Sequence, residues 1–227
     1  MGELRIISYS SEPFQDRREA GDMLARDLEK YGGRNTVVLG IPRGGIVVAR
    51  QIAGILGAEF DVVLARKLGA PGNPELAIGA VAEDGKVFLD EALADTLGVS
   101  QSYLKREKEH QLEVITERIT QYRSILPKAS VEGKTAIITD DGIATGATMK
   151  AALWAVRQER PERLIAAIPV APPESLESIS SEADETVCLR VPAFFAAVGQ
   201  FYNSFEQIDD AVVLAILKEE RRREYAK

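Results

Sequence analysis

The sequence predicts an α/β fold, with an open and mostly parallel twisted sheet that is flanked by helices and carries a small hood subdomain. Short apolar stretches of strand length alternate with longer helical runs along most of the chain. This order is typical of parallel sheets with crossover helices. The length of 227 residues suits one α/β domain, so we treat residues 1–227 as a single domain with a core of about 36–191.

The first half of the chain begins with an amphipathic helix over residues 13–31, whose apolar side chains recur at helical spacing. The following elements, in order, are a strand at 36–41, a helix at 46–56, a strand at 60–68, a loop in the Gly/Pro-rich "GAPGNPE" and a hairpin at 76–89 that turns at Asp84-Gly85.

A long charged helix is predicted over residues 101–126. Its apolar side chains step by three and four, which indicates either an intramolecular packing seam or a dimer contact; they are Leu112, Ile115, Ile119, Tyr122 and Leu126. The remaining elements are strands at 135–140, 163–171 and 185–191, the last of them closing the core, helices at 145–159 and 172–181, an irregular aromatic stretch at 192–205 and a final helix from about Asp210.

Composition removes several classes of function. The formal net charge of -7 argues against a general nucleic-acid binder. No apolar run approaches membrane-spanning length, and the N-terminal residues lack the apolar core of a signal peptide. The single cysteine, Cys188, forms no internal disulfide, so we expect a cytoplasmic protein without nucleic-acid or membrane partners. One histidine, His110, lies among charges on the long helix, which makes a Ser-His-Asp triad or a zinc site implausible.

The most informative stretch is "IITDDGIATGAT", from Ile137 to Thr148. A strand ends at Asp140 and Asp141, and small residues then turn the chain into a helix. Backbone N–H groups at such a helix start bind phosphate well, and threonine hydroxyls add donors. Two carboxylates nearby can accept hydrogen bonds from sugar hydroxyls or approach a metal. Together these features indicate a ribose 5-phosphate site, and the alternative is an ordinary helix N-cap with two solvent-facing acids.

The same string resembles the phosphoribosyl pyrophosphate (PRPP) motif of the type I phosphoribosyltransferases. The resemblance implies that Asp140 and Asp141 hold the ribose hydroxyls. It also implies that the following loop wraps the 5-phosphate through Ile143, Ala144, Thr145, Gly146, Ala147 and Thr148. Two departures from the family pattern are Thr139, where an apolar residue is usual, and Ala147, where glycine is frequent.

Other segments are similar to the family in order and spacing. "GIPRGG" stands where the family has a pyrophosphate-binding turn, so Arg43, Gly44 and Gly45 are candidates for that group; an ordinary tight turn is the alternative. The stretch from Arg66 to Leu89 stands where the family has a mobile loop and hairpin. Arg66 and Lys67 are candidates for added charge near the diphosphate, or else a solvated strand end.

The resemblance implies an enzyme, a glycosyltransferase that transfers the phosphoribosyl group of PRPP to a nucleobase-like acceptor with release of pyrophosphate. Mg²⁺ is the implied cofactor, held mainly through PRPP with Asp140 and Asp141 as further ligands. A hood from residues 192–210 and the N-terminal segment would read the base, with Phe201 and Tyr202 as stacking candidates or as a small hydrophobic core. A homodimer is compatible with the family. The alternative functions are a non-catalytic PRPP or nucleotide sensor and a phosphoribosyl hydrolase.

Overall fold

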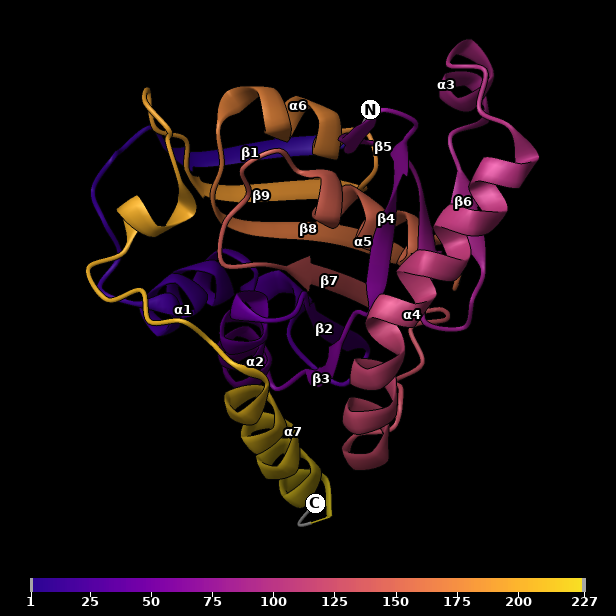
Figure 1. Ribbon diagram of the computed structural model, residues 1–227. Coiled ribbons are helices and arrows are strands. Elements are labelled where there is room, and N and C mark those ends of the chain that lie inside the picture. Colours follow the sequence, from indigo (N-terminus) through magenta and orange to yellow (C-terminus); the bar gives the residue numbers. More distant parts are fainter. Residues whose placement is uncertain (1, 226–227) are drawn as a thin grey trace.

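The computed structural model describes residues 2–225 and contains a large parallel sheet and a small antiparallel one (Figure 1). The large sheet has six strands in the order β1-β9-β8-β7-β2-β3, and every neighbouring pair is parallel. This confirms the predicted fold class. The strands are β1 (Glu3–Ser8), β2 (Thr36–Gly40), β3 (Glu59–Val62), β7 (Thr135–Thr139), β8 (Arg163–Val170) and β9 (Glu185–Arg190).

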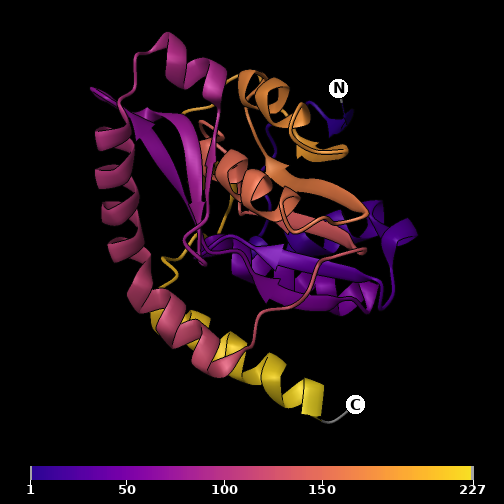
Figure 2. The same cartoon turned by 90° about the vertical axis from the view of Figure 1, so that its right-hand side faces the viewer.

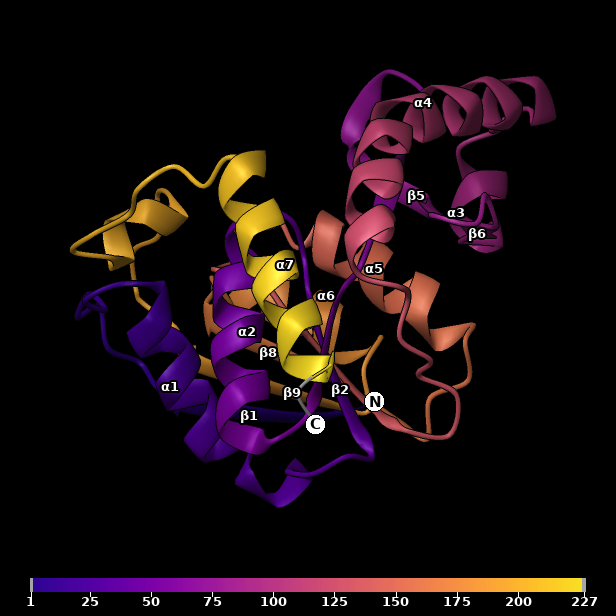
Figure 3. The same ribbon diagram turned by 90° about the horizontal axis from the view of Figure 1, so that it is seen from below.

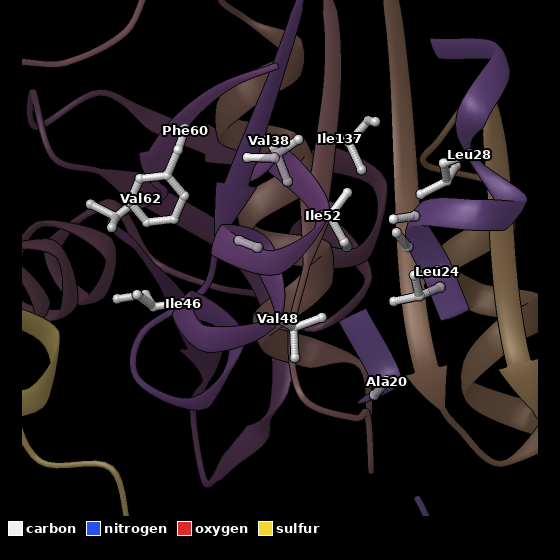
Figure 4. Packing of buried hydrophobic residues seen from close by; sticks show 14 of the residues in the cluster. Ala20, Leu24, Leu28, Val38, Ile46, Val48, Ile52, Phe60, Val62 and Ile137 are labelled. Atoms are coloured by element: carbon white, nitrogen blue, oxygen red, sulfur yellow. The ribbon is translucent and has the colours of Figure 1, made fainter. Parts of the chain in front are cut away.

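Helices cover both faces of the large sheet, because its inner strands are apolar on both sides. Val38 and Ile137 point into a core under α1 and α2, where Figure 4 shows them with Ile52 and Leu24. Their neighbours, such as Ile138, point into a second core under α5 and α6. The covering helices are α1 (Arg17–Asp27), α2 (Gly44–Leu56), α5 (Ala147–Arg157) and α6 (Pro173–Ser180), and the short helices are η1 (Glu29–Tyr31) and η2 (Val198–Phe201).

A small subdomain is built on the antiparallel sheet β4-β5-β6. Leu68, Ile78 and Val81 form its own core, against which side chains of α3 and α4 pack. Figure 2 shows this sheet and the long helix α4 on the same side of the molecule. The elements are β4 (Ala65–Ala70), β5 (Asn73–Ala82), β6 (Val87–Leu89), α3 (Glu91–Thr96) and α4 (Gln101–Ile125).

Two predicted elements were wrong, and one strand was missed. The single strand at 60–68 is two strands, β3 and β4, in different sheets. No turn residue marks the break between them, because the apolar side chains of this stretch are shared among three separate cores. The "GAPGNPE" loop is a hairpin, since β4 ends at Ala70 and β5 begins at Asn73, with Gly72 in the left-handed region at φ +77°. The strand β1 was missed, and it extends the sheet beyond β9.

The apolar stripe of α4 is an intramolecular seam, as one of the two interpretations predicted. Ile115, Tyr122 and Leu126 are buried, and the latter two belong to the core under α1 and α2. The last helix, α7 (Asp210–Tyr225), packs against α2 and α4, and Figure 3 shows it beside α2. Within residues 2–225, no helix combines the length and the apolar character that crossing a membrane requires.

A buried ion network lies where the chain passes between the two sheets. Arg123 of α4 donates to Asp61 Oδ1 of β3 (2.6 Å) and to Glu83 Oε2 beside β5 (2.9 Å). Asp61 also accepts from the amides of Val62 and Ala129. Burial raises the pKa of Asp61 to about 6, against the opposing effect of the Arg123 charge. Arg123 thereby links Asp61 of the large sheet to Glu83, which lies beside β5 of the small sheet.

Candidate active site

The loop between β7 and α5 stands at the carboxyl end of the large sheet, where open α/β sheets bind ligands. Neighbouring elements fix its main chain: the amide of Ile143 donates to the Val170 carbonyl of β8 (2.9 Å), and Ser175 Oγ of α6 donates to the Ala144 carbonyl (2.5 Å). Gly146 caps α5 in the left-handed region, at φ +77°. The loop therefore places the N-terminus of α5 at the surface.

Within that loop, the residues predicted to bind phosphate differ in exposure. Ala144, Thr145 and Thr148 are exposed, whereas Ile143, Gly146 and Ala147 are buried. A buried residue can still contribute its main-chain amide, and an exposed threonine can contribute its hydroxyl. Thr145 Oγ1 lies 3.5 Å from the amide of Ala147, close to the first turn of α5.

The two acids at the end of β7 have different surroundings. Asp140 accepts hydrogen bonds from the amides of Asp141 and Gly45, while burial and the charge of Asp141 raise its pKa well above the ordinary value. Asp141 is held by side chains: Arg17 Nε donates to its Oδ2 (2.8 Å), and Tyr202 Oη donates to its carbonyl (2.5 Å). The acid pair is therefore anchored from three distant parts of the chain.

The structure brings Gly44 and Gly45 against the acid pair, because β2 and β7 are adjacent and their following turns meet at one edge. A Cβ on Gly44 would lie 1.8 Å from Asp141 Oδ2, and a Cβ on Gly45 would lie 2.7 Å from the Cα of Asp140. Only glycine allows this approach. The two motifs that the sequence singled out thus form one site.

Of the three candidate cations for the diphosphate, Arg43, Arg66 and Lys67, none has its side chain hydrogen-bonded to the acid pair in the contacts described below. Arg43 Nη1 lies 3.9 Å from Asp210 Oδ2 at the start of α7. Asp210 Oδ1 also meets Arg118 Nε at 3.3 Å and accepts from the Tyr122 hydroxyl at 2.7 Å. Arg43 belongs to the same turn as Gly44, but its side chain is turned toward α7 in this structure.

Arg66 and Lys67 lie on β4 of the small sheet, and adjacent residues of a strand point to opposite faces. Arg66 Nε donates to Gln111 Oε1 of α4 (2.9 Å), so its side chain is engaged with α4. Lys67 lies on the other face of the strand. The placement of these two side chains therefore adds no support to a diphosphate role.

The aromatic stacking candidates are buried. Phe201 is 1% exposed and Tyr202 is 6% exposed, and both belong to the core under α1 and α2. Tyr202 packs on Phe14 with ring centroids 5.3 Å apart. Burial raises the pKa of Tyr202, which keeps its hydroxyl a donor. Both rings therefore belong to a hydrophobic core, as one of the two interpretations predicted, and we do not propose that they stack on the acceptor base.

The segment 192–210 nevertheless lies beside the acid pair, together with N-terminal residues. The amide of Phe14 donates to the Phe201 carbonyl (2.8 Å), and the amide of Asn203 donates to the Phe14 carbonyl (2.8 Å). A Cβ on Gly142, next to the acids, would meet Val198 Cγ1 at 2.5 Å. Figure 1 shows this segment and the start of α1 at one end of the large sheet, with the small subdomain on the opposite side.

Sequence reasoning missed Arg17. It occupies the first turn of α1, where the positive end of the helix dipole disfavours a cation. Its side chain is only 9% exposed. An arginine directly after the N-cap Asp16 was a signal that the residue has a partner elsewhere in the fold, although nothing in the sequence names Asp141 as that partner.

Comparisons with known proteins agree with this geometry. The model of the phosphoribosyl transferase domain matches residues 15–204. The crystal structure of TT1426 from Thermus thermophilus is similar, with 49% identity, a TM-score of 0.87 and coverage of 91% of this chain and 98% of that one. A Mycobacterium tuberculosis H37Rv protein, whose name provisionally classes it as a phosphoribosyl transferase, is 40% identical over 209 residues, as is its counterpart in strain CDC 1551.

Those two matches cover 92% of this chain but 47% of each relative, so the chain spans about half the length of the curated relatives it matches. The matched region includes the acid pair, the loop to α5 and the turn at Gly44, which are the parts of the site that the structure brings together. Because this family model matches most of the chain, the chain belongs to the phosphoribosyl transferase domain family.

Proposed function

We propose that the protein transfers the 5-phosphoribosyl group of PRPP to a nucleobase or a related nitrogen heterocycle and releases pyrophosphate. One observation carries the proposal: the acid pair lies between the start of α5 and the turn of Gly44 and Gly45. A phosphate site, two hydroxyl acceptors and a glycine turn follow one another in the order in which PRPP presents phosphate, ribose and diphosphate.

Each part has a chemical role in this proposal. The loop 143–148 binds the 5-phosphate through main-chain amides and the hydroxyls of Thr145 and Thr148. Asp140 and Asp141 accept from the ribose hydroxyls. The turn at Gly44 faces the diphosphate with the Gly44 amide, while the Gly45 amide holds Asp140 beside it. Arg43 joins them once its side chain leaves Asp210.

The reaction displaces pyrophosphate from C1 by a nitrogen of the acceptor, so the protein need not supply a nucleophile. It must hold the ribose in a reactive orientation, stabilise the charge that develops on the leaving group and exclude water. The segment 192–210 lies beside the acid pair, and of its aromatic side chains Phe194 is 74% exposed. We propose this segment and the N-terminal residues as the cover over the acceptor.

Mg²⁺ fits the donor set, because hard carboxylate oxygens suit it and it commonly binds through substrate phosphates. In residues 2–225 no three Asp, Glu, His or Cys side chains cluster in a way that could hold a metal ion. We propose that Mg²⁺ is held mainly by PRPP, with Asp140 and Asp141 as oxygen ligands, and that it would neutralise charge on the leaving pyrophosphate. A cytoplasmic homodimer in nucleobase salvage completes the proposal.

The decisive experiment measures pyrophosphate release from PRPP and Mg²⁺, without acceptor and with each common nucleobase in turn. Release that depends on one base supports the transferase and names its acceptor. Release without a base indicates a hydrolase, and PRPP binding without release indicates a sensor. The matched control is the double variant Asp140→Asn with Asp141→Asn, which should keep its fold and lose PRPP affinity. Unchanged affinity would refute the assignment of these acids to the ribose.

A further inference from the structure

Arg17 is bound on three sides at the acid pair. Its Nε donates to Asp141 Oδ2 (2.8 Å), and its Nη1 donates to the carbonyl of Glu206 (2.9 Å). Its Cζ lies 3.9 Å from the centre of the Phe205 ring, a cation–π contact. The planar guanidinium holds two hydrogen bonds in a fixed fork, so its orientation is determined by the C-terminal segment and transmitted to the carboxylate of Asp141.

This arrangement is not the one that stability alone favours. Taking an arginine out of water at the positive end of a helix dipole is unfavourable, and a buried ion pair often contributes no more than an apolar pair would. The contact does determine which carboxylate oxygen is used. Since Arg17 uses an acceptor position of Asp141 Oδ2, Oδ1 is the less occupied oxygen and the better acceptor for a ligand hydroxyl.

The main chain of Asp141 is fixed independently of Arg17. Tyr202 Oη donates to its carbonyl (2.5 Å), and its amide donates to Asp140 Oδ1 (2.8 Å). Removing the guanidinium therefore frees the rotation of one side chain while its backbone remains in place. The phosphate loop is held by other contacts, those of Ile143 with Val170 and of Ser175 with Ala144.

We propose that Arg17 is a positioning residue for the ribose of the substrate, which fixes the Asp141 carboxylate so that Oδ1 meets a ribose hydroxyl. The inference rests on the proposed function, because it takes Asp141 as a ribose ligand. Arg17 itself contacts no substrate. It acts through Asp141, and it does so only while the segment of Phe205 and Glu206 is folded against the start of α1.

The test separates ribose binding from phosphate binding. Dissociation constants of ribose 5-phosphate and of inorganic phosphate are measured by calorimetric competition against PRPP, for the wild type and for Arg17→Met. We expect the ribose 5-phosphate constant to rise roughly ten- to a hundredfold, as for the loss of a hydrogen bond to a charged group. The phosphate constant should stay within about twofold, since the phosphate loop makes no use of Arg17. A merely structural role would weaken both ligands or neither.

A double-mutant cycle with Asp141→Asn supplies the second readout. If Arg17 acts through Asp141, the double variant binds ribose 5-phosphate no more weakly than the weaker single variant. Additive losses overturn the proposal. Arg18→Met is the matched control, because Arg18 is the next residue of the same helix turn and is exposed; its constants should equal those of the wild type.

Two further variants keep the test decisive if Arg17→Met does not fold. Arg17→Lys keeps the charge but loses the fork, and Phe205→Leu removes the ring under the guanidinium. Both should weaken ribose 5-phosphate several-fold and leave phosphate unchanged, and unchanged ribose 5-phosphate binding in both overturns the inference. If the wild type binds neither PRPP nor ribose 5-phosphate, the proposed function itself fails. If the wild type binds and Arg17→Met matches it, only the role of Arg17 fails.

Discussion

Replacing Gly44 by alanine tests whether the turn after β2 must approach the acid pair as closely as it does. The new Cβ would lie 1.8 Å from Asp141 Oδ2 and 3.1 Å from Arg17 Nε. Both atoms belong to side chains, so we expect the main chain to hold and the carboxylate of Asp141 to rotate away. The variant thereby removes the proposed ribose contact without changing either acid.

The size of the effect follows from what is lost. A hydrogen bond to a charged carboxylate contributes about 1.5–3 kcal/mol, so the dissociation constant of PRPP should rise roughly ten- to 150-fold. Stability should fall as well, because the rotation separates Asp141 Oδ2 from the largely buried Arg17 Nε. Alanine is favoured over glycine in a helix by roughly 0.5–1 kcal/mol, and this gain partly offsets the crowding at Asp141.

The assay is calorimetric titration with PRPP and Mg²⁺, run beside chemical denaturation. Gly54→Ala is the matched control, since Gly54 lies in the same helix α2 and a Cβ there meets nothing within 4 Å. We expect the control to bind like the wild type and to be more stable by roughly 0.5–1 kcal/mol. A Gly44→Ala protein that binds PRPP within twofold of the wild type would refute the reasoning.

Four other outcomes are expected. Thr145→Val should lose a phosphate hydrogen bond and weaken PRPP by about 1.5–3 kcal/mol; equal affinity in calorimetry would count against it. Arg123→Met should lower the free energy of unfolding by about 3–5 kcal/mol, because it leaves the carboxylate of Asp61 buried without its cation; a denaturation curve like that of the wild type would contradict this. Burial raises the pKa of Asp61 from 3.8 to about 6. Its contribution to the free energy of unfolding is therefore complete below pH 3.8 and is lost as the pH rises through 6, by up to about 3 kcal/mol. Asp61→Asn should remove this decline between pH 3.8 and 6, and a variant whose stability changes with pH as the wild type's does would argue against the raised pKa. The hairpin turn within residues 69–75 should be protected from proteolysis by PRPP and Mg²⁺, and identical cleavage with and without ligand would exclude it as a lid.

Much of the fold could be predicted because parallel strands buried on both faces are apolar along their whole length. The strands at 36–41, 135–140, 163–171 and 185–191 each contain a strand of the large sheet. The site was predictable for a related reason. The acids and the phosphate loop are contiguous in sequence, and the glycine turn directly follows the strand next to theirs.

The failures have physical causes that a single sequence does not display. The edge strand β1 is partly exposed along its length, so its side chains show no strong apolar pattern. The break between β3 and β4 has no polar or turn residue to mark it, because Val63 and Leu64 are buried where the chain crosses from one sheet to the other. Phe201 and Tyr202 are ambiguous in sequence, since an aromatic ring serves a core and a ligand equally well.

The orientation of Asp141 illustrates the limit most clearly. Its identity as a candidate follows from its position after β7, but three remote segments determine where its carboxylate points. Gly44 leaves the space it occupies, Arg17 holds one of its oxygens across 124 positions of sequence, and Tyr202 holds its carbonyl. A side chain held in this way loses little further freedom when a ligand binds, and precise placement of this kind is what a reaction that relies on positioning requires. The residue that carries the chemistry could be predicted from the sequence, while its preorganisation arises only from tertiary contacts.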